Sequence, residues 1–160
     1  MNTSNKPKLW HCYTARSLRA LWAMEEMGID YDLEEFFDVN VLGTVPYFVD
    51  GDIDMTESSA IGLYLVERYQ RYDFGLKSTD KEYADYLNWL FHSDATLTFP
   101  QTLVLRYSQL EPVERRQPQI VEDYRKWFLA RLKRLNAHVA DREFLCDGRF
   151  TIADIAIAYA

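Results

Sequence analysis

The chain has 160 residues, of which 48% are hydrophobic, and its formal charge is -7. This much apolar surface excludes a disordered chain and suffices for one or two compact units, while the acidic charge disfavours nucleic acid as a partner. No apolar run reaches the roughly 18 residues that a transmembrane helix needs, and the first eight residues lack the apolar core of a signal peptide. We therefore expect a cytoplasmic protein that has no membrane partner.

Cysteines and histidines are few and scattered along the chain. The cysteines are Cys12 and Cys146, and the histidines are His11, His92 and His138. They do not have the spacing of zinc ligands, and two cysteines are too few for a disulfide framework. The sequence therefore predicts no metal site.

The first part of the chain alternates between strand-like and helix-like patterns. Residues 8–12 are typical of a strand, and the apolar residues that follow them have helical spacing up to Gly28, a residue type that often ends a helix. Residues 29–33 predict a second strand. We therefore expect a strand, a helix and a second strand before residue 34.

A hairpin and a further helix are expected next. Residues 45–49 and 53–55 flank the sequence Asp-Gly-Asp, which is typical of a tight turn between antiparallel strands. Thr56 is then expected to cap a helix that ends near Tyr69. This order of elements predicts a small α/β domain with a mixed sheet, which we place at residues 1–70.

Strand patterns disappear in the second half of the chain. Residues 82–107 and 113–142 carry aromatic residues at the spacing of buried helix positions. Thr151 and Asp154 have the spacing of a capping box, in which each side chain accepts a backbone N–H at the other end of the first turn of a helix. The expected organisation is therefore a linker at residues 71–80 and an all-α domain at residues 81–160.

Two short segments of the α/β domain have features of a binding site. Pro46 permits a cis peptide bond after Val45, whose backbone could then pair with an extended peptide as a sheet edge does. Thr56, Glu57 and Ser58 open a helix, and the free amides and partial positive charge of a helix start favour an anion. Ser58 would hold a carboxylate and Glu57 an adjacent ammonium group, as in the head group of an α-amino acid. An ordinary trans proline and a plain helix cap are the alternatives.

Together these segments resemble the cytosolic glutathione S-transferases, of the serine type or a bacterial type. The resemblance rests on "ARSLRALWAMEEMG", "NVLGTVPYFVDGD", "TESSAI" and "GRFTIAD", and it covers nearly the whole chain. It implies an α/β thioredoxin-like N-terminal domain followed by an all-α C-terminal domain, and a homodimer. It also implies that Val45 and Pro46 pair with the cysteinyl backbone of glutathione and that Glu57 and Ser58 hold its γ-glutamyl group.

The resemblance further implies a hydroxyl that stabilises the glutathione thiolate at the start of the first helix. In serine-type relatives this hydroxyl lies fourteen residues before the glycine that ends the helix, and counting back from Gly28 gives Thr14. A threonine at this position departs from the usual serine. Ser17 is the second candidate, and the remaining alternatives use Tyr13, Cys12 or Arg16.

The implied reaction is attack of the bound glutathione thiolate on a small electrophilic substrate, with glutathione as co-substrate, as in detoxification. We expect this substrate between the two domains, near Tyr13, Phe91, His92 and Phe99. A non-catalytic binding or regulatory module and a glutathione-dependent isomerase or dehalogenase are alternatives. A thiol transferase acting through Cys12 is another, although the thioredoxin pattern would need a second cysteine three residues on.

Two segments are shorter than the resemblance implies. Only residues 34–44 join the second strand to the hairpin, whereas a crossover between parallel strands usually takes about a dozen residues or more. The helix that begins after Thr151 is strongly apolar and reaches Ala160 without later helices to cover it. We therefore expect that residues are missing between Asp32 and Phe37 and after Ala160.

Overall fold

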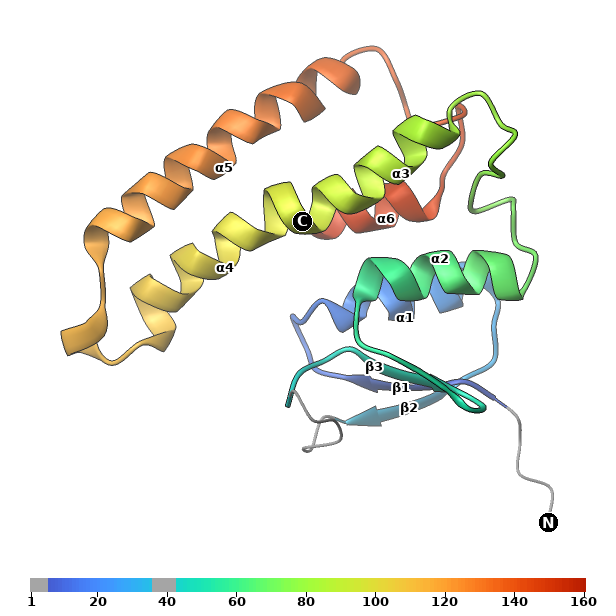
Figure 1. Ribbon diagram of the computed structural model, residues 1–160, viewed down its shortest axis with the longest axis horizontal. Coiled ribbons are helices and arrows are strands. Elements are labelled where there is room, and N and C mark those ends of the chain that lie inside the picture. The colour runs from blue at the N-terminus through green and yellow to red at the C-terminus, as the bar shows by residue number, and fades with distance from the viewer. Residues whose placement is uncertain (1–5, 36–42) are drawn as a thin grey trace. The chain divides into compact units, whose positions relative to one another are not determined.

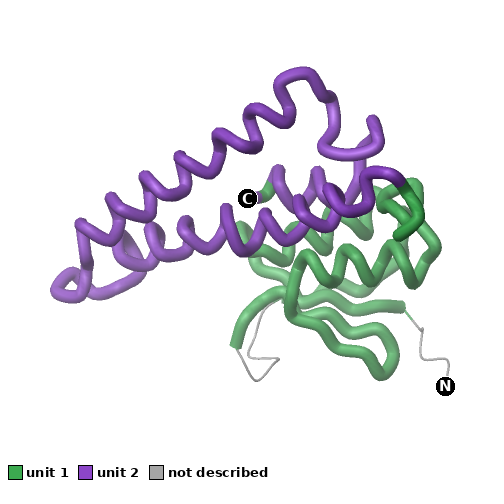
Figure 2. Tube along the Cα trace, turned by 45° about the horizontal axis from the view of Figure 1, so that its top comes forward, with its two compact units in different colours: residues 1–80, 159 green, residues 81–158, 160 purple. Residues whose placement is uncertain are grey.

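The computed structural model (Figure 1) describes residues 6–35 and 43–160 of the chain. The chain divides into two compact units, which Figure 2 colours separately: residues 1–80 with Tyr159, and residues 81–158 with Ala160. The expected omission between Asp32 and Phe37 falls partly outside the described residues, because residues 36–42 are not described.

The first unit contains a four-stranded mixed sheet. Its strands are β1 (Lys8–His11), β2 (Asp32–Glu35), β3 (Tyr47–Asp50) and β4 (Ile53–Met55), in the order β2-β1-β3-β4. β2 is parallel to β1, β3 is antiparallel to β1, and β4 is antiparallel to β3. The hairpin between β3 and β4 turns at Gly51, whose φ of 63° favours glycine. The expected mixed sheet and hairpin are confirmed.

The second strand begins later than the sequence predicted. Residues 29–33 were expected, but β2 is Asp32–Glu35. Ile29 instead completes the end of α1 (Ser17–Met27), because its N–H donates to the carbonyl of Met24 at 3.0 Å. All four residues of β2 are exposed, so no apolar alternation marks the bounds of this strand.

Two helices, α1 and α2 (Ser58–Arg68), pack side by side on one face of the sheet (Figure 1). The buried residues of each helix recur at spacings of three and four, so that each helix has one apolar face. The core of the first unit consists mainly of Leu9, Ala20, Met24, Phe48, Ile61, Leu65 and Val66. α2 begins one residue later than expected. The residue at its cap position is Glu57, which is extended, and not Thr56.

The second unit begins with a long helical run. α3 (Tyr83–Phe91), a π-helical segment (His92–Thr98), α4 (Phe99–Leu105) and a second π-helical segment (Arg106–Leu110) follow one another without a break. The sequence predicted one helix over residues 82–107, and its position is confirmed. The π-helical segments were not predicted, because i to i+5 hydrogen bonding has no distinctive apolar period in a short segment.

α5 (Pro118–His138) lies alongside α4 (Figure 1). It is shorter than the helix expected over residues 113–142, because Pro118 has no N–H to donate and occupies the first turn, where none is needed. A separate short 3-10 helix precedes it at Val113–Arg115. In the described residues no helix has both the length and the apolar character needed to cross a membrane.

α6 (Ile152–Tyr159) begins with the expected capping box. The N–H of Thr151 donates to Oδ2 of Asp154 at 2.8 Å, and the N–H of Ala153 donates to Oγ1 of Thr151 at 3.3 Å. Oδ1 of Asp154 accepts the N–H of Leu145 at 2.9 Å, so the same carboxylate also holds the loop before the helix. These bonds give Thr151 and Asp154 a folding role.

Candidate functional site

Three segments of the first unit meet at one end of its sheet. β1 pairs with β3 in antiparallel register through Trp10 and Tyr47, so the residues before Tyr47 continue beside those that follow β1. β4 pairs Met55 with Phe48, which brings the start of α2 to the same end. This end therefore carries the turn after β1, the Val45–Pro46 peptide bond and the N-terminus of α2.

The Val45–Pro46 peptide bond is cis, which decides against the ordinary trans proline that the sequence left as an alternative. Pro46 is buried, Val45 is half-buried, and both lie directly before β3. The backbone of Val45 therefore belongs to the end of the sheet at which the other predicted binding residues gather.

The N-terminus of α2 contributes a small polar region. Glu57 is exposed and has an extended backbone, and its side chain does not cap the helix. Ser58, the first residue of α2, is 3% exposed. The backbone amides of the first turn of a helix have no acceptor within the helix and carry a partial positive charge. This helix end can therefore bind an anion such as a carboxylate.

Arg19 adds a buried positive charge behind this helix end. It lies on α1, is 2% exposed, and its Nη1 donates to Oγ of Ser58 at 3.2 Å. Because Oγ of Ser58 accepts this bond, the hydroxyl proton of Ser58 is free to be donated to an anion. Arg19 was not predicted from the sequence. The available signal was a charged residue among the apolar positions of a helix face, together with Ala20, Ala23 and Met24.

The turn between β1 and α1 presents three exposed residues, Cys12, Tyr13 and Thr14. β1 ends at His11, so Cys12 belongs to this turn and its thiol is exposed. Tyr13 is 88% exposed, and Thr14 has a φ of 68°. The two hydroxyls predicted as thiol activators thus differ in surroundings, because Thr14 is exposed whereas Ser17 is fully buried.

The buried hydroxyl of Ser17 has two neighbours that the sequence did not reveal. Its Oγ lies 2.9 Å from Nδ1 of His11 and accepts the N–H of Cys12 at 3.4 Å. Burial lowers the pKa of His11, so that its neutral form is favoured.

The other residues expected near an electrophile lie in the second unit. Phe91 ends α3 and Phe99 begins α4, and both rings are exposed. The His92 ring lies edge-on to Trp89 at 5.3 Å between centroids, and its Nε2 is buried without a hydrogen-bond partner among the described residues. The pKa of His92 is lowered by burial and by the positive charge of Arg134. Their proposed role beside Tyr13 stays a prediction.

Residues 6–67 match the glutathione S-transferase N-terminal domain. Over 155 residues the chain is 26% identical to glutathione S-transferase 3 of Zea mays, an alignment that covers 86% of this chain and 68% of that protein. Over 64 residues it is 42% identical to glutathione S-transferase theta-2 of Homo sapiens, which covers 38% of this chain and 25% of that protein.

Solved structures extend the likeness to both units. The chain is similar to the glutathione transferase URE2P6 from Phanerochaete chrysosporium, crystallised in complex with oxidized glutathione, with a TM-score of 0.85 and 24% identity. The similarity covers 98% of this chain and 78% of that one. It confirms the expected fold, in which an α/β thioredoxin-like domain is followed by a helical one.

Proposed function

Because this chain belongs to the cytosolic glutathione S-transferase family, we propose that it binds glutathione and uses the bound thiolate to attack a small electrophile. The observation that carries the proposal is the N-terminus of α2, where the Ser58 hydroxyl is backed by the buried Arg19. Similar proteins of known structure were crystallised with glutathione or with a glutathionyl conjugate, which supports glutathione as the ligand.

Two parts of glutathione, the γ-glutamyl group and the cysteinyl residue, have matching groups in the first unit. The γ-glutamyl carboxylate accepts bonds from the Ser58 hydroxyl and from the amides at the start of α2, and Glu57 neutralises the adjacent ammonium group. The backbone of Val45 pairs with the cysteinyl residue in the manner of an added strand. With glutathione in this orientation, its sulfur lies towards the turn that follows β1, because the strand register gathers these segments at one end of the sheet.

Activation of the thiol requires a donor at that turn. A free thiol has a pKa of about 8.5, and only the thiolate is a strong nucleophile. Thr14 donates its hydroxyl proton to the sulfur in our proposal, since this hydroxyl is in the exposed turn. One good hydrogen bond to the anion is worth about 1.5 kcal/mol or more, which corresponds to about one unit of pKa depression. The thiol proton is released to solvent, the thiolate sulfur forms the new bond to the electrophile, and the electron pair passes to the acceptor or its leaving group.

Calorimetry and a turnover screen test this function. Glutathione should bind at millimolar concentration or below, and a dinitrohalobenzene or another small electrophile should be conjugated. Binding without turnover of any electrophile would favour the non-catalytic module, and absence of binding would refute the proposal. We further propose that the protein acts as a cytoplasmic homodimer, which sedimentation of the full chain tests; a monomer at micromolar concentration would contradict it.

Thiol transfer is the second candidate, and the exposed thiol of Cys12 at the same turn favours it. In that reaction the Cys12 thiolate would attack a glutathionyl disulfide and release a thiol. Mass spectrometry after incubation with oxidized glutathione would reveal a mixed disulfide on Cys12. Full conjugating activity in Cys12→Ala would assign the reaction to glutathione itself.

A further inference from the structure

The turn between β1 and α1 has an unfavourable backbone conformation. The N–H of Ala15 donates to the carbonyl of Cys12 at 3.1 Å, and Thr14, the third residue of this turn, has a φ of 68°. Glycine or asparagine usually occupies such a position, because a β-branched side chain crowds the backbone at positive φ. Interactions outside Thr14 must therefore hold the turn.

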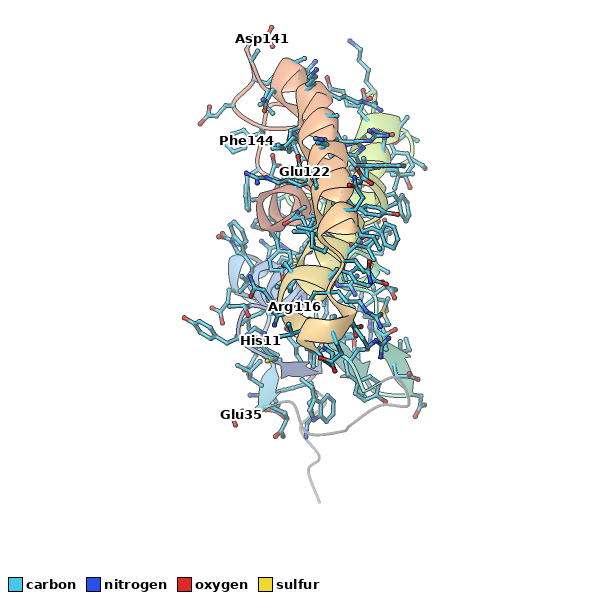
Figure 3. All side chains as sticks on the ribbon, turned by 90° about the vertical axis from the view of Figure 1, so that its left-hand side faces the viewer. His11, Glu35, Arg116, Glu122, Asp141 and Phe144 are labelled. Atoms are coloured by element: carbon cyan, nitrogen blue, oxygen red, sulfur yellow. The ribbon has the colours of Figure 1, made fainter. Side chains whose placement is uncertain are left out.

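A partly buried bridge of hydrogen bonds around Ser17 joins the two ends of this turn. The fully buried hydroxyl of Ser17 joins Nδ1 of His11 on one side and the N–H of Cys12 on the other. His11 is the last residue of β1 and pairs with Glu35 of β2, two residues that Figure 3 labels on neighbouring strands. Because Ser17 is the first residue of α1, the bridge connects the sheet to the helix across the whole turn.

The hydroxyl of Ser17 has a single proton to donate. The hydroxyl oxygen accepts the N–H of Cys12, and the hydroxyl donates its proton to Nδ1 of His11 in the neutral tautomer whose ring proton is on Nε2. The lowered pKa of His11 favours this neutral form. Ser17 is therefore fully buried and hydrogen-bonded to His11, whereas Thr14 lies in the exposed turn.

We propose that His11 and Ser17 are positioning residues that hold the turn so that the Thr14 hydroxyl faces the thiol of bound glutathione. This inference rests on the proposed function. Without the bridge, the turn relaxes towards backbone conformations that threonine prefers, and the hydroxyl leaves the sulfur. The pKa of the bound thiol then rises, while the contacts of Ser58 with the γ-glutamyl group stay in place.

Removing the bridge in the full chain tests the inference. Ser17→Ala and His11→Leu should each lower kcat by about tenfold, because a thiol pKa raised by one unit leaves about a tenth of the thiolate at neutral pH. The KM for glutathione should change by less than about twofold. His11→Asn should retain most of the activity, because its side-chain oxygen can replace Nδ1 as the acceptor. The ultraviolet absorbance of the thiolate, followed against pH, measures the thiol pKa in each variant.

A double variant separates positioning from a direct role. Because Ser17 acts through Thr14, Thr14→Ala with Ser17→Ala should be no slower than Thr14→Ala alone. Losses that multiply would overturn the inference, as would His11→Asn being as slow as His11→Leu. Ser78→Ala removes an exposed serine outside the site and serves as the matched control. If Ser17→Ala does not fold, the two His11 variants decide the question.

The proposed function and the positioning role fail in different ways. If the unaltered chain does not bind glutathione in the calorimeter, the proposed function is wrong. If it binds glutathione with a lowered thiol pKa that is the same in Ser17→Ala, only the positioning role is wrong.

Discussion

Replacing Ser58 with alanine should weaken the binding of glutathione. The Ser58 side chain is buried, and its oxygen accepts a bond from the Arg19 guanidinium at 3.2 Å. In the proposed complex its proton is donated to the γ-glutamyl carboxylate. A hydrogen bond to a charged group contributes about 1.5 to 3 kcal/mol, so the dissociation constant should rise by about 10-fold to 150-fold.

The same substitution should also lower the stability of the free protein. It removes one acceptor from a buried guanidinium, and a buried donor that loses its acceptor costs about 1 to 3 kcal/mol. In a chain of 150 to 250 residues, 1 kcal/mol shifts Tm by about 2 to 4 °C. Thermal unfolding of Ser58→Ala should therefore begin several degrees lower than that of the unaltered chain.

A glutathione analogue without the γ-glutamyl α-carboxylate separates the two effects. If Ser58 binds this carboxylate, the unaltered chain should bind the analogue about as weakly as Ser58→Ala binds glutathione. Ser58→Ala should then bind the analogue about as well as it binds glutathione, because this variant already lacks the bond to the carboxylate. Ser78→Ala is again the control for loss of a hydroxyl. Equal affinity of the unaltered chain and Ser58→Ala for glutathione would refute the reasoning.

Other side chains give predictions of reactivity, pH dependence and stability. Iodoacetamide should label the exposed Cys12 well before Cys146, because burial raises the pKa of Cys146 to about 12, and equal rates by mass spectrometry would contradict this. Burial and Arg134 lower the pKa of His92 from 6.5, so its contribution to stability is present above pH 6.5 and is lost as the pH falls through the folded-state pKa. His92→Phe should therefore reduce the loss of unfolding free energy on acidification, and an unchanged pH profile would count against it. Thr151→Ala should lower the unfolding free energy in urea by about 1 kcal/mol through loss of the helix cap, and no change would exclude that role.

Signals that depend on neighbouring residues were read correctly from the sequence. The hairpin at Gly51, the helix end at Gly28 and the capping box of Thr151 and Asp154 each involve residues a few positions apart. Their geometry follows from backbone preferences and local hydrogen bonds, so it needs no knowledge of the tertiary structure.

Features that depend on distant pairs were not predicted. Arg19 and Ser58 are 39 residues apart, and the sequence offers only a charge on an apolar helix face. The bridge between His11 and Ser17 is nearer in sequence, but it exists only because the turn brings the end of a strand to the start of a helix. The bounds of β2 were wrong for a different reason, since an exposed strand at the edge of a sheet has no buried side to impose a pattern.

The two π-helical segments between α3 and α5 determine where an alignment of this chain with its relatives can contain one-residue gaps. A residue inserted into a regular α-helix rotates every later side chain by about 100° around the axis, because each turn holds 3.6 residues. A π-helical turn already contains an additional residue, so His92–Thr98 and Arg106–Leu110 can each lose a residue and become α-helical while the neighbouring helices keep their buried faces. One-residue gaps inside this continuous helix are therefore acceptable in an alignment with relatives, and single-residue deletions should be tolerated better in these two segments than in α3.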